Sequence, residues 1–224
     1  MCGRFTQERA TSELAEIFGA VDLADDPGGR YNVAPTDEAA VVVQRDEQRA
    51  IVRYRWGLVP HWSDDARGAA RRINARAETV GSSPAFREPF ARRRCLVPVD
   101  SFYEWRREGT VRQPYRVVRT DGRPLALAGL WSGWRDPADG AMRRTFTIVT
   151  SVPNGLVSTL HDRMPVVVPE EAWARWLDPS LRDVGELHGL LVPDEALPVE
   201  IHAVPRLVND VRRDGPELIA RLPA

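Results

Sequence analysis

The first residues that could do chemistry stand at the start of the chain, where Cys2 follows Met1. Methionine aminopeptidases remove an initial methionine when the next side chain is small, and cysteine meets that condition. We therefore expect a chain in which Cys2 carries a thiol and a free α-amine on neighbouring carbons. Unperturbed, the amine has a pKa of about 7.7–8.0 and the thiol one of about 8.5. Such an aminothiol condenses with an aldehyde to a thiazolidine ring.

The composition limits which amino group of the chain can react with an aldehyde. All 31 of the Lys and Arg residues are arginines, so no lysine competes for a carbonyl group. A GC-rich genome would produce the same bias, but the chemical consequence is unchanged: a Schiff base must form at the N-terminus. The second cysteine, Cys95, does not suggest a disulfide framework. Two cysteines and no signal peptide predict a protein of the reducing bacterial cytosol.

Three polar residues in mixed or aromatic surroundings could assist Cys2. The Asn74 amide can hydrogen-bond a nucleophile or a substrate oxygen. Glu104 stands among Phe102, Tyr103 and Trp105, and burial there would raise its pKa into a range useful for acid–base catalysis. His161 can move protons near neutral pH. Each segment alone also fits a plain structural role: a capped surface helix, an outward-facing strand residue or a solvated loop.

Arginines interleaved with aromatic residues suggest contact with nucleic acid. Residues 55–62 and 29–36 combine Arg with Trp or Tyr, a pattern that can hold phosphates and stack bases. The formal net charge of -1 excludes a globally basic binder but allows a local basic groove. Residues 71–72 and 92–94 could extend that groove, although a solvated charge run explains 92–94 equally well.

Several other classes of protein are not supported. The two Cys and four His residues lack metal-ligand spacing, so we expect no metal. Neither a P-loop nor a dinucleotide fingerprint occurs, so we expect no cofactor. No apolar run approaches the ~20 residues of a membrane span.

The periodicity predicts one α+β domain over residues 1–224 with a mostly antiparallel, twisted and barrel-like sheet and flanking helices. Thr6 is a candidate cap for a helix that ends at Phe18, with Gly19 as its stop. Predicted strands are 39–43, 50–56, 94–99, 102–105, 115–119, 125–131, 145–151 and 199–204, with a hairpin loop at 135–141. Predicted helices are 73–80, 170–177 and 181–190. On the first of these, Asn74 and Glu78 would share a face.

Six ordered segments resemble the SRAP family, the SOS-response-associated peptidases. They are CGRF at 2–5, RYNVAP at 30–35, WGLVP at 56–60, NARAET at 74–79, FYEW at 102–105 and HDRMP at 161–165. The tail at 204–209 also looks like the end of the family pattern. One departure is Ser63, where the family often has a second tryptophan after Trp62.

The resemblance implies a fold and a chemistry. SRAP domains are α+β domains with a barrel-like sheet that bind single-stranded DNA and single-strand/double-strand junctions. They capture abasic sites as a thiazolidine crosslink to the N-terminal cysteine. By position, the catalytic residues would be Cys2, Asn74, Glu104 and His161, and the DNA-binding residues Arg4, Pro35, Trp62, Arg76 and Arg163. We expect a monomer that associates with the nucleoid when bound to DNA.

Two other functions remain open from the residues. N-terminal-nucleophile peptidases or amidases also use a terminal cysteine, with its own amine as the base. Non-covalent binding of modified single-stranded DNA would need only the arginines and aromatic side chains.

Overall fold

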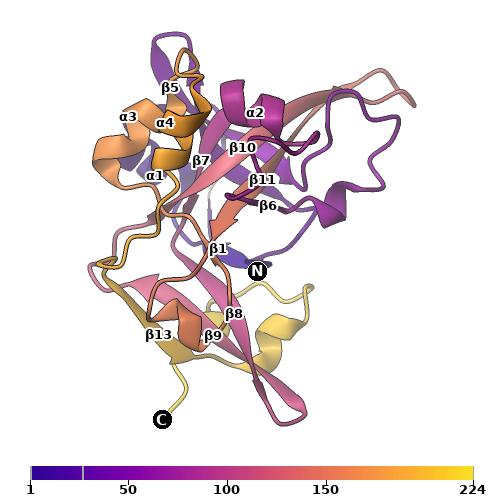
Figure 1. Ribbon diagram of the computed structural model, residues 1–224. Helices are drawn as coiled ribbons and strands as arrows, with labels where there is room; N and C mark the ends of the chain where they lie inside the picture. Colours follow the sequence, from indigo (N-terminus) through magenta and orange to yellow (C-terminus); the bar gives the residue numbers. More distant parts are fainter. Residues whose placement is uncertain (1, 27, 224) are drawn as a thin grey trace.

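The computed structural model describes residues 2–26 and 28–223, and its strands form two sheets (Figure 1). The strands are β1 (Phe5–Gln7), β2 (Ala20–Asp22), β3 (Arg30–Val33), β4 (Glu38–Arg45), β5 (Gln48–Trp56), β6 (Asn74–Arg76), β7 (Arg94–Val99), β8 (Ser101–Glu108), β9 (Val111–Arg119), β10 (Leu125–Arg135), β11 (Met142–Ser151), β12 (Met164–Pro165) and β13 (Val199–Ala203). The helices are α1 (Thr11–Phe18), α2 (Arg87–Arg92), α3 (Trp173–Leu177) and α4 (Val184–Gly189), with 3-10 turns η1 (Ala69–Arg71), η2 (Val157–Thr159), η3 (Glu170–Ala172), η4 (Arg206–Asn209) and η5 (Pro216–Ile219).

The larger sheet closes into a barrel. Its strand order is β12-β11-β10-β7-β4-β5-β2, and β11 also pairs with β5 in parallel, which joins the two ends of the run β5-β4-β7-β10-β11. The second sheet, in the order β13-β9-β8-β1-β3, lies below the barrel in Figure 1. Of its labelled strands, β1 lies nearest to the barrel. The predicted α+β class and barrel-like, mostly antiparallel sheet are therefore confirmed.

The barrel strands are buried on both faces. In β4, Val41 and Val43 join a core shared with the second sheet, whereas Ala40 and Val42 join a core covered by the helices. Because successive side chains of a strand point to opposite faces, a continuous apolar run is what a strand between two cores requires. On the helical side, Phe18 of α1 stacks on Trp173 of α3 with ring centroids 4.4 Å apart.

Two local predictions were wrong. Thr6 does not cap a helix: it lies in β1, buried, with its hydroxyl 2.8 Å from Ser101 Oγ, and α1 begins only at Thr11. The predicted helix at 73–80 is instead the short strand β6 followed by a turn. Parallel pairing of Asn74 with Ile148 on β11 supplies its backbone hydrogen bonds, so tertiary contacts override the local helix propensity. As a result Asn74 shares a strand face with Arg76 and not a helix face with Glu78.

Several element ends agree with the sequence. Gly19 ends α1 in the left-handed region (φ 56), which glycine adopts without strain. The loop 135–141 joins β10 to β11 as a hairpin, as predicted. The last predicted helix, 181–190, is shorter than expected: it begins at Val184, after Asp183 caps it by accepting a hydrogen bond from the Glu186 backbone N–H. No helix in the described part of the chain is long and apolar enough to cross a membrane. The single domain over 1–224 stays a prediction.

Candidate active site

The N-terminal segment is fixed by the strand β6. The Asn74 side chain donates a hydrogen bond from Nδ2 to the carbonyl oxygen of Cys2 at 2.8 Å. Asn74 Oδ1 is buried and accepts no hydrogen bond from any residue that the structure describes. A buried acceptor without a partner is costly, so this oxygen is placed to accept a hydrogen bond from a substrate or from a free amine at Cys2. Met1, whose removal the sequence predicts, lies outside the described residues.

Glu104 supplies a carboxyl group with an altered acidity. It lies within β8, opposite Tyr115 of β9, and is only 2% exposed. Burial disfavours the charged form and raises the pKa of Glu104 to about 7. Burial also raises the pKa of the Cys2 thiol, and the negative charge of Glu104 raises it further, so the two groups lie within electrostatic reach.

His161 supplies a second acid–base group. It follows η2, and its Nδ1 accepts a hydrogen bond from the Arg163 backbone N–H at 3.0 Å. The same Nδ1 also lies 2.7 Å from Asp162 Oδ1. Burial lowers the pKa of His161 below its usual 6.5. His161 and Glu104 line one cavity of about 330 Å³, so two acid–base groups with displaced pKa values face the same space.

Three cavities that share lining residues form one groove past Glu104. The first (about 300 Å³) is lined by Gly3, Arg4, Trp105, Arg112 and Asn209, and the second (about 330 Å³) by Glu104, Trp105, Arg107, Arg112 and His161. The third (about 700 Å³) is lined by Arg76, Glu78, Thr79, His161, Asp162 and Arg163. Trp105 and Arg112 join the first to the second, and His161 joins the second to the third. We call this continuous surface the groove.

The three arginines predicted to contact DNA all line the groove, but they differ in their exposure and in the partners that they already bind. Arg4 donates from Nη1 to Asn32 Oδ1 at 2.6 Å, and burial lowers its pKa. Arg163 forms a two-point ion pair with Glu78, at 2.6 and 2.9 Å. Arg76 is exposed. A phosphate could therefore contact Arg76 at once, whereas it would compete with Glu78 for Arg163.

Pro35 and Trp62 do not line the groove. Pro35 lies in the turn between β3 and β4, and Trp62 lies in the loop after β5, 59% exposed. The Trp62 loop is held by Trp134 of β10, whose Nε1 donates to the Ser63 carbonyl oxygen at 2.6 Å. An exposed indole on an anchored loop can stack on a base, although none of the three groove cavities includes Trp62 in its lining.

The sequence reasoning missed two groove arginines, Arg107 and Arg112, and the part played by Trp105. The Trp105 indole donates to Asn209 Oδ1 at 2.7 Å and lies under the Arg4 guanidinium, 5.8 Å from its ring centroid. A signal existed: Arg107 and Arg112 flank a glycine at 109, which predicts a hairpin that places them opposite each other.

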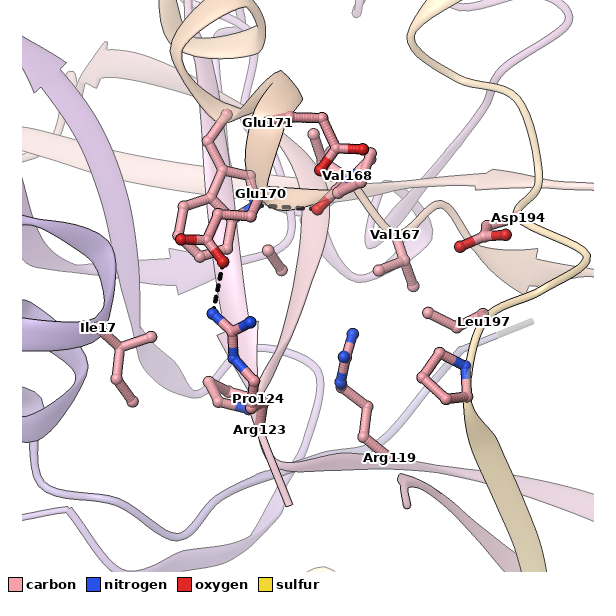
Figure 2. Close-up of a pocket in the computed structure, with 14 residues that line it drawn as sticks. Ile17, Arg119, Arg123, Pro124, Val167, Val168, Glu170, Glu171, Asp194 and Leu197 are labelled. Atoms are coloured by element: carbon pink, nitrogen blue, oxygen red, sulfur yellow. Dashed lines mark hydrogen bonds and ion pairs between the residues drawn. The ribbon is translucent and has the colours of Figure 1, made fainter. Parts of the chain in front are cut away.

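A separate cavity of about 260 Å³ lies elsewhere on the molecule (Figure 2). Ile17, Val167 and Leu197 form part of its wall, and Arg123 pairs with Glu170 at 2.5 Å. Neither Cys2 nor any other predicted site residue lines it. Cys2 itself is fully buried and lines none of the three groove cavities, but the adjacent Gly3 lines the first of them.

Comparisons with known proteins identify the family of this chain. The family described as SOS response associated peptidase (SRAP) matches residues 1–211. Abasic site processing protein YoqW of Bacillus subtilis is 38% identical, over 98% of this chain and 99% of its own. Abasic site processing protein YedK of Escherichia coli is 32% identical, again over 98% and 99%. A crystal structure of a protein from Bacteroides thetaiotaomicron superposes with a TM-score of 0.89 at 26% identity, over 99% of this chain and 100% of that one. The chain therefore belongs to the SRAP family.

Proposed function

We propose that this protein captures abasic sites in single-stranded DNA as a covalent crosslink to Cys2, after Met1 is removed, and so shields the strand from cleavage. Its relatives YoqW and YedK are named abasic site processing proteins. The observation that carries the proposal is the arrangement around Cys2: Asn74 bonded to its carbonyl at 2.8 Å, and Glu104, with a pKa of about 7, within electrostatic reach of its thiol.

The chemistry follows from the two nucleophiles of a terminal cysteine. The α-amine of Cys2 adds to the C1′ aldehyde of the ring-opened deoxyribose, and loss of one water gives an imine. The thiol sulfur then adds to C1′, and its proton goes to the imine nitrogen, which closes a thiazolidine. An imine left at this position promotes β-elimination and strand scission. Ring closure removes the imine and therefore protects the strand.

The neighbouring groups fit the proton transfers. Glu104 would open the sugar ring and protonate the leaving hydroxyl, since a carboxyl of pKa about 7 exists in both forms near neutral pH. His161, which faces the same cavity, would act as a second acid–base group, including in reversal of the crosslink. Asn74 would orient the amine or the sugar through Oδ1.

The DNA strand would follow the groove. Arg4, Arg76 and Arg163 would contact its phosphates, and Trp62 and Pro35 would meet bases or a strand end beyond it. A junction between single and double strands would place its duplex outside the groove. We propose that the protein acts as a monomer in the bacterial cytosol and joins the nucleoid when it binds DNA.

A crosslinking assay tests this function. Purified protein is incubated with uracil-containing single-stranded DNA that uracil glycosylase has converted to abasic DNA, and then denatured. The wild type should give a band that survives denaturation and needs the glycosylase. Cys2→Ala should abolish it, whereas Cys95→Ala should not, because Cys95 lies inside the chain and has no free α-amine with which to form an imine and close a thiazolidine.

A serine variant separates the thiazolidine from a simple imine. Cys2→Ser keeps the amine but loses the thiol, so borohydride should trap it while the untreated complex falls apart. Because the chain has no lysine, a trapped imine can arise only at the N-terminus. An equally stable crosslink in Cys2→Ser, or retention of Met1 in crosslinking-competent protein by intact mass, would contradict the mechanism. Turnover of amide or peptide probes without any crosslink would indicate an N-terminal-nucleophile hydrolase instead.

A further inference from the structure

We infer that Arg107 and Arg112, on the hairpin formed by β8 and β9, bind a backbone phosphate of the DNA strand on the side of the reactive centre opposite to Arg76 and Arg163. The inference rests on the proposed function in one respect: it takes the strand to lie in the groove. It adds a binding site of its own, for a phosphodiester, at residues that the sequence motifs do not include.

The register of the hairpin places the two positive charges together. Arg107 and Arg112 are direct cross-strand partners in the antiparallel pair, so their side chains leave the same face of the hairpin. Like charges directly opposite each other destabilise a sheet. A pair of guanidinium groups in this arrangement gains most from an anion that both can contact.

Among the described residues, the two arginines also lack the carboxylate partners that other arginines near strand ends of this chain have. Arg143, at the hairpin of β10 and β11, lies 2.8 Å from Asp136, and Arg119 pairs with Asp121. Within the described residues, Arg107 donates only to the backbone oxygen of Gly109, at 3.2 Å, and Arg112 forms no ion pair. Both are exposed. Their charge is therefore available to a ligand.

The groove gives the position of that ligand. Arg107 and Arg112 line the same cavity as Glu104 and His161, and Arg112 extends into the next cavity beside Arg4. Arg76 and Arg163 lie beyond His161, in the third cavity. A strand whose abasic sugar reaches Glu104 would thus pass cationic side chains in both directions. One flanking phosphate would meet Arg107 and Arg112, and another would meet Arg76.

Salt dependence tests this placement without crosslinking. The probe is single-stranded DNA with one tetrahydrofuran abasic analogue, which has no aldehyde, and binding is followed by fluorescence anisotropy over a range of salt concentrations. Each phosphate contact contributes about 0.7 to the slope of log K against log salt for a single strand. The double variant Arg107→Gln/Arg112→Gln should lower the slope by about 0.7 if both arginines share one phosphate, and by about 1.4 if they hold two.

Two further double variants serve as controls for the salt dependence. Arg175→Gln/Arg182→Gln removes the same charge from exposed positions in and near α3 and α4, at the far end of the molecule in Figure 1, and should leave the slope unchanged. Arg107→Lys/Arg112→Lys keeps the charges and should restore the slope. A neutral methylphosphonate at the flanking position that meets Arg107 and Arg112 should lower the slope for wild type and leave the slope of the Gln variant unchanged.

The outcomes are separable from those of the proposed function. An unchanged slope in Arg107→Gln/Arg112→Gln, or an equal fall in the α3–α4 control, overturns the phosphate site even if the wild type crosslinks abasic DNA normally. A reduced slope restored by lysine supports the site even if the wild type forms no crosslink, in which case it is the covalent function that fails.

Discussion

Replacing Glu104 by glutamine should make the fold more stable above neutral pH while it slows the reaction. The carboxyl is 2% exposed, and burial raises its pKa from 4.5 to about 7. An ionised carboxylate in this position destabilises the folded state, because burial removes water from the charge. The neutral amide of glutamine has no charge to desolvate. The carboxyl of Glu104 therefore supports the reaction but lowers the stability of the fold.

The size and the sign of this difference in the free energy of unfolding follow from proton linkage. A tenfold change in proton affinity corresponds to about 1.4 kcal/mol, so the rise from 4.5 to about 7 corresponds to about 3 kcal/mol. Between these two pH values the folded protein holds more protons than the unfolded chain. The free energy of unfolding of the wild type therefore falls as the pH rises through this window. The variant lacks the group, so its advantage should grow by about 3 kcal/mol between pH 4 and pH 8.

Urea unfolding at pH 4, 6 and 8, followed by tryptophan fluorescence, measures this difference. The change across pH is the informative quantity, because any fixed cost of fitting the glutamine amide cancels. Glu47→Gln, at an exposed position, is the matched control and should show no such trend. The crosslinking rate of Glu104→Gln should fall and lose its dependence on pH near 7, with DNA binding retained. A pH-independent stability difference would refute the reasoning, and equal losses of binding and rate would assign Glu104 a structural role.

Three further outcomes are expected. Asn74→Ala should slow crosslinking and cost about 1 kcal/mol in urea unfolding, the usual worth of one hydrogen bond; an unaltered rate would remove it from the site. Trp62→Ala should weaken binding of single-stranded DNA by about 1–3 kcal/mol, the worth of one stacked base, with an unchanged melting temperature because the side chain is 59% exposed; equal affinity would show that no base stacks there. Glu78→Gln should free Arg163 from its ion pair, while the bond to the Thr150 carbonyl oxygen remains, and tighten binding by up to about fivefold, since a partly exposed ion pair is worth about 1 kcal/mol; weaker binding would mean that the pair itself shapes the groove.

Much of the fold could be predicted because its strands carry strong local patterns. The run Val41-Val42-Val43 predicts a strand buried on both faces, and it separates two cores as such a strand must. The segment 73–80 misled because its composition favours a helix. Its strand conformation depends on pairing with β11, about 70 residues away in the chain, and local propensity does not contain that partner.

The reactive residues could be predicted because each belongs to a short motif, and the motifs occur in a fixed order. What could not be predicted was how they meet: Asn74 reaches Cys2 through β6, and His161 reaches Glu104 across a cavity. Arg107 and Arg112 were missed for a related reason. Their side chains lie opposite each other because of the cross-strand register. That register follows from the sequence only when the predicted strands 102–105 and 115–119 are extended until they meet in a hairpin.

The raised pKa of the Cys2 thiol also fixes the order of the proposed steps. Burial and the nearby Glu104 keep the sulfur protonated, and a neutral thiol is a poor nucleophile. We therefore expect the amine to attack the aldehyde first. Once the imine has formed, the thiol is already adjacent, and it needs only to lose its proton as the imine nitrogen gains one. A carboxyl group with a pKa of about 7 can accept the first proton and supply the second without a net change of charge. The buried position that makes the free thiol inert thus suits it to act only when an aldehyde has arrived.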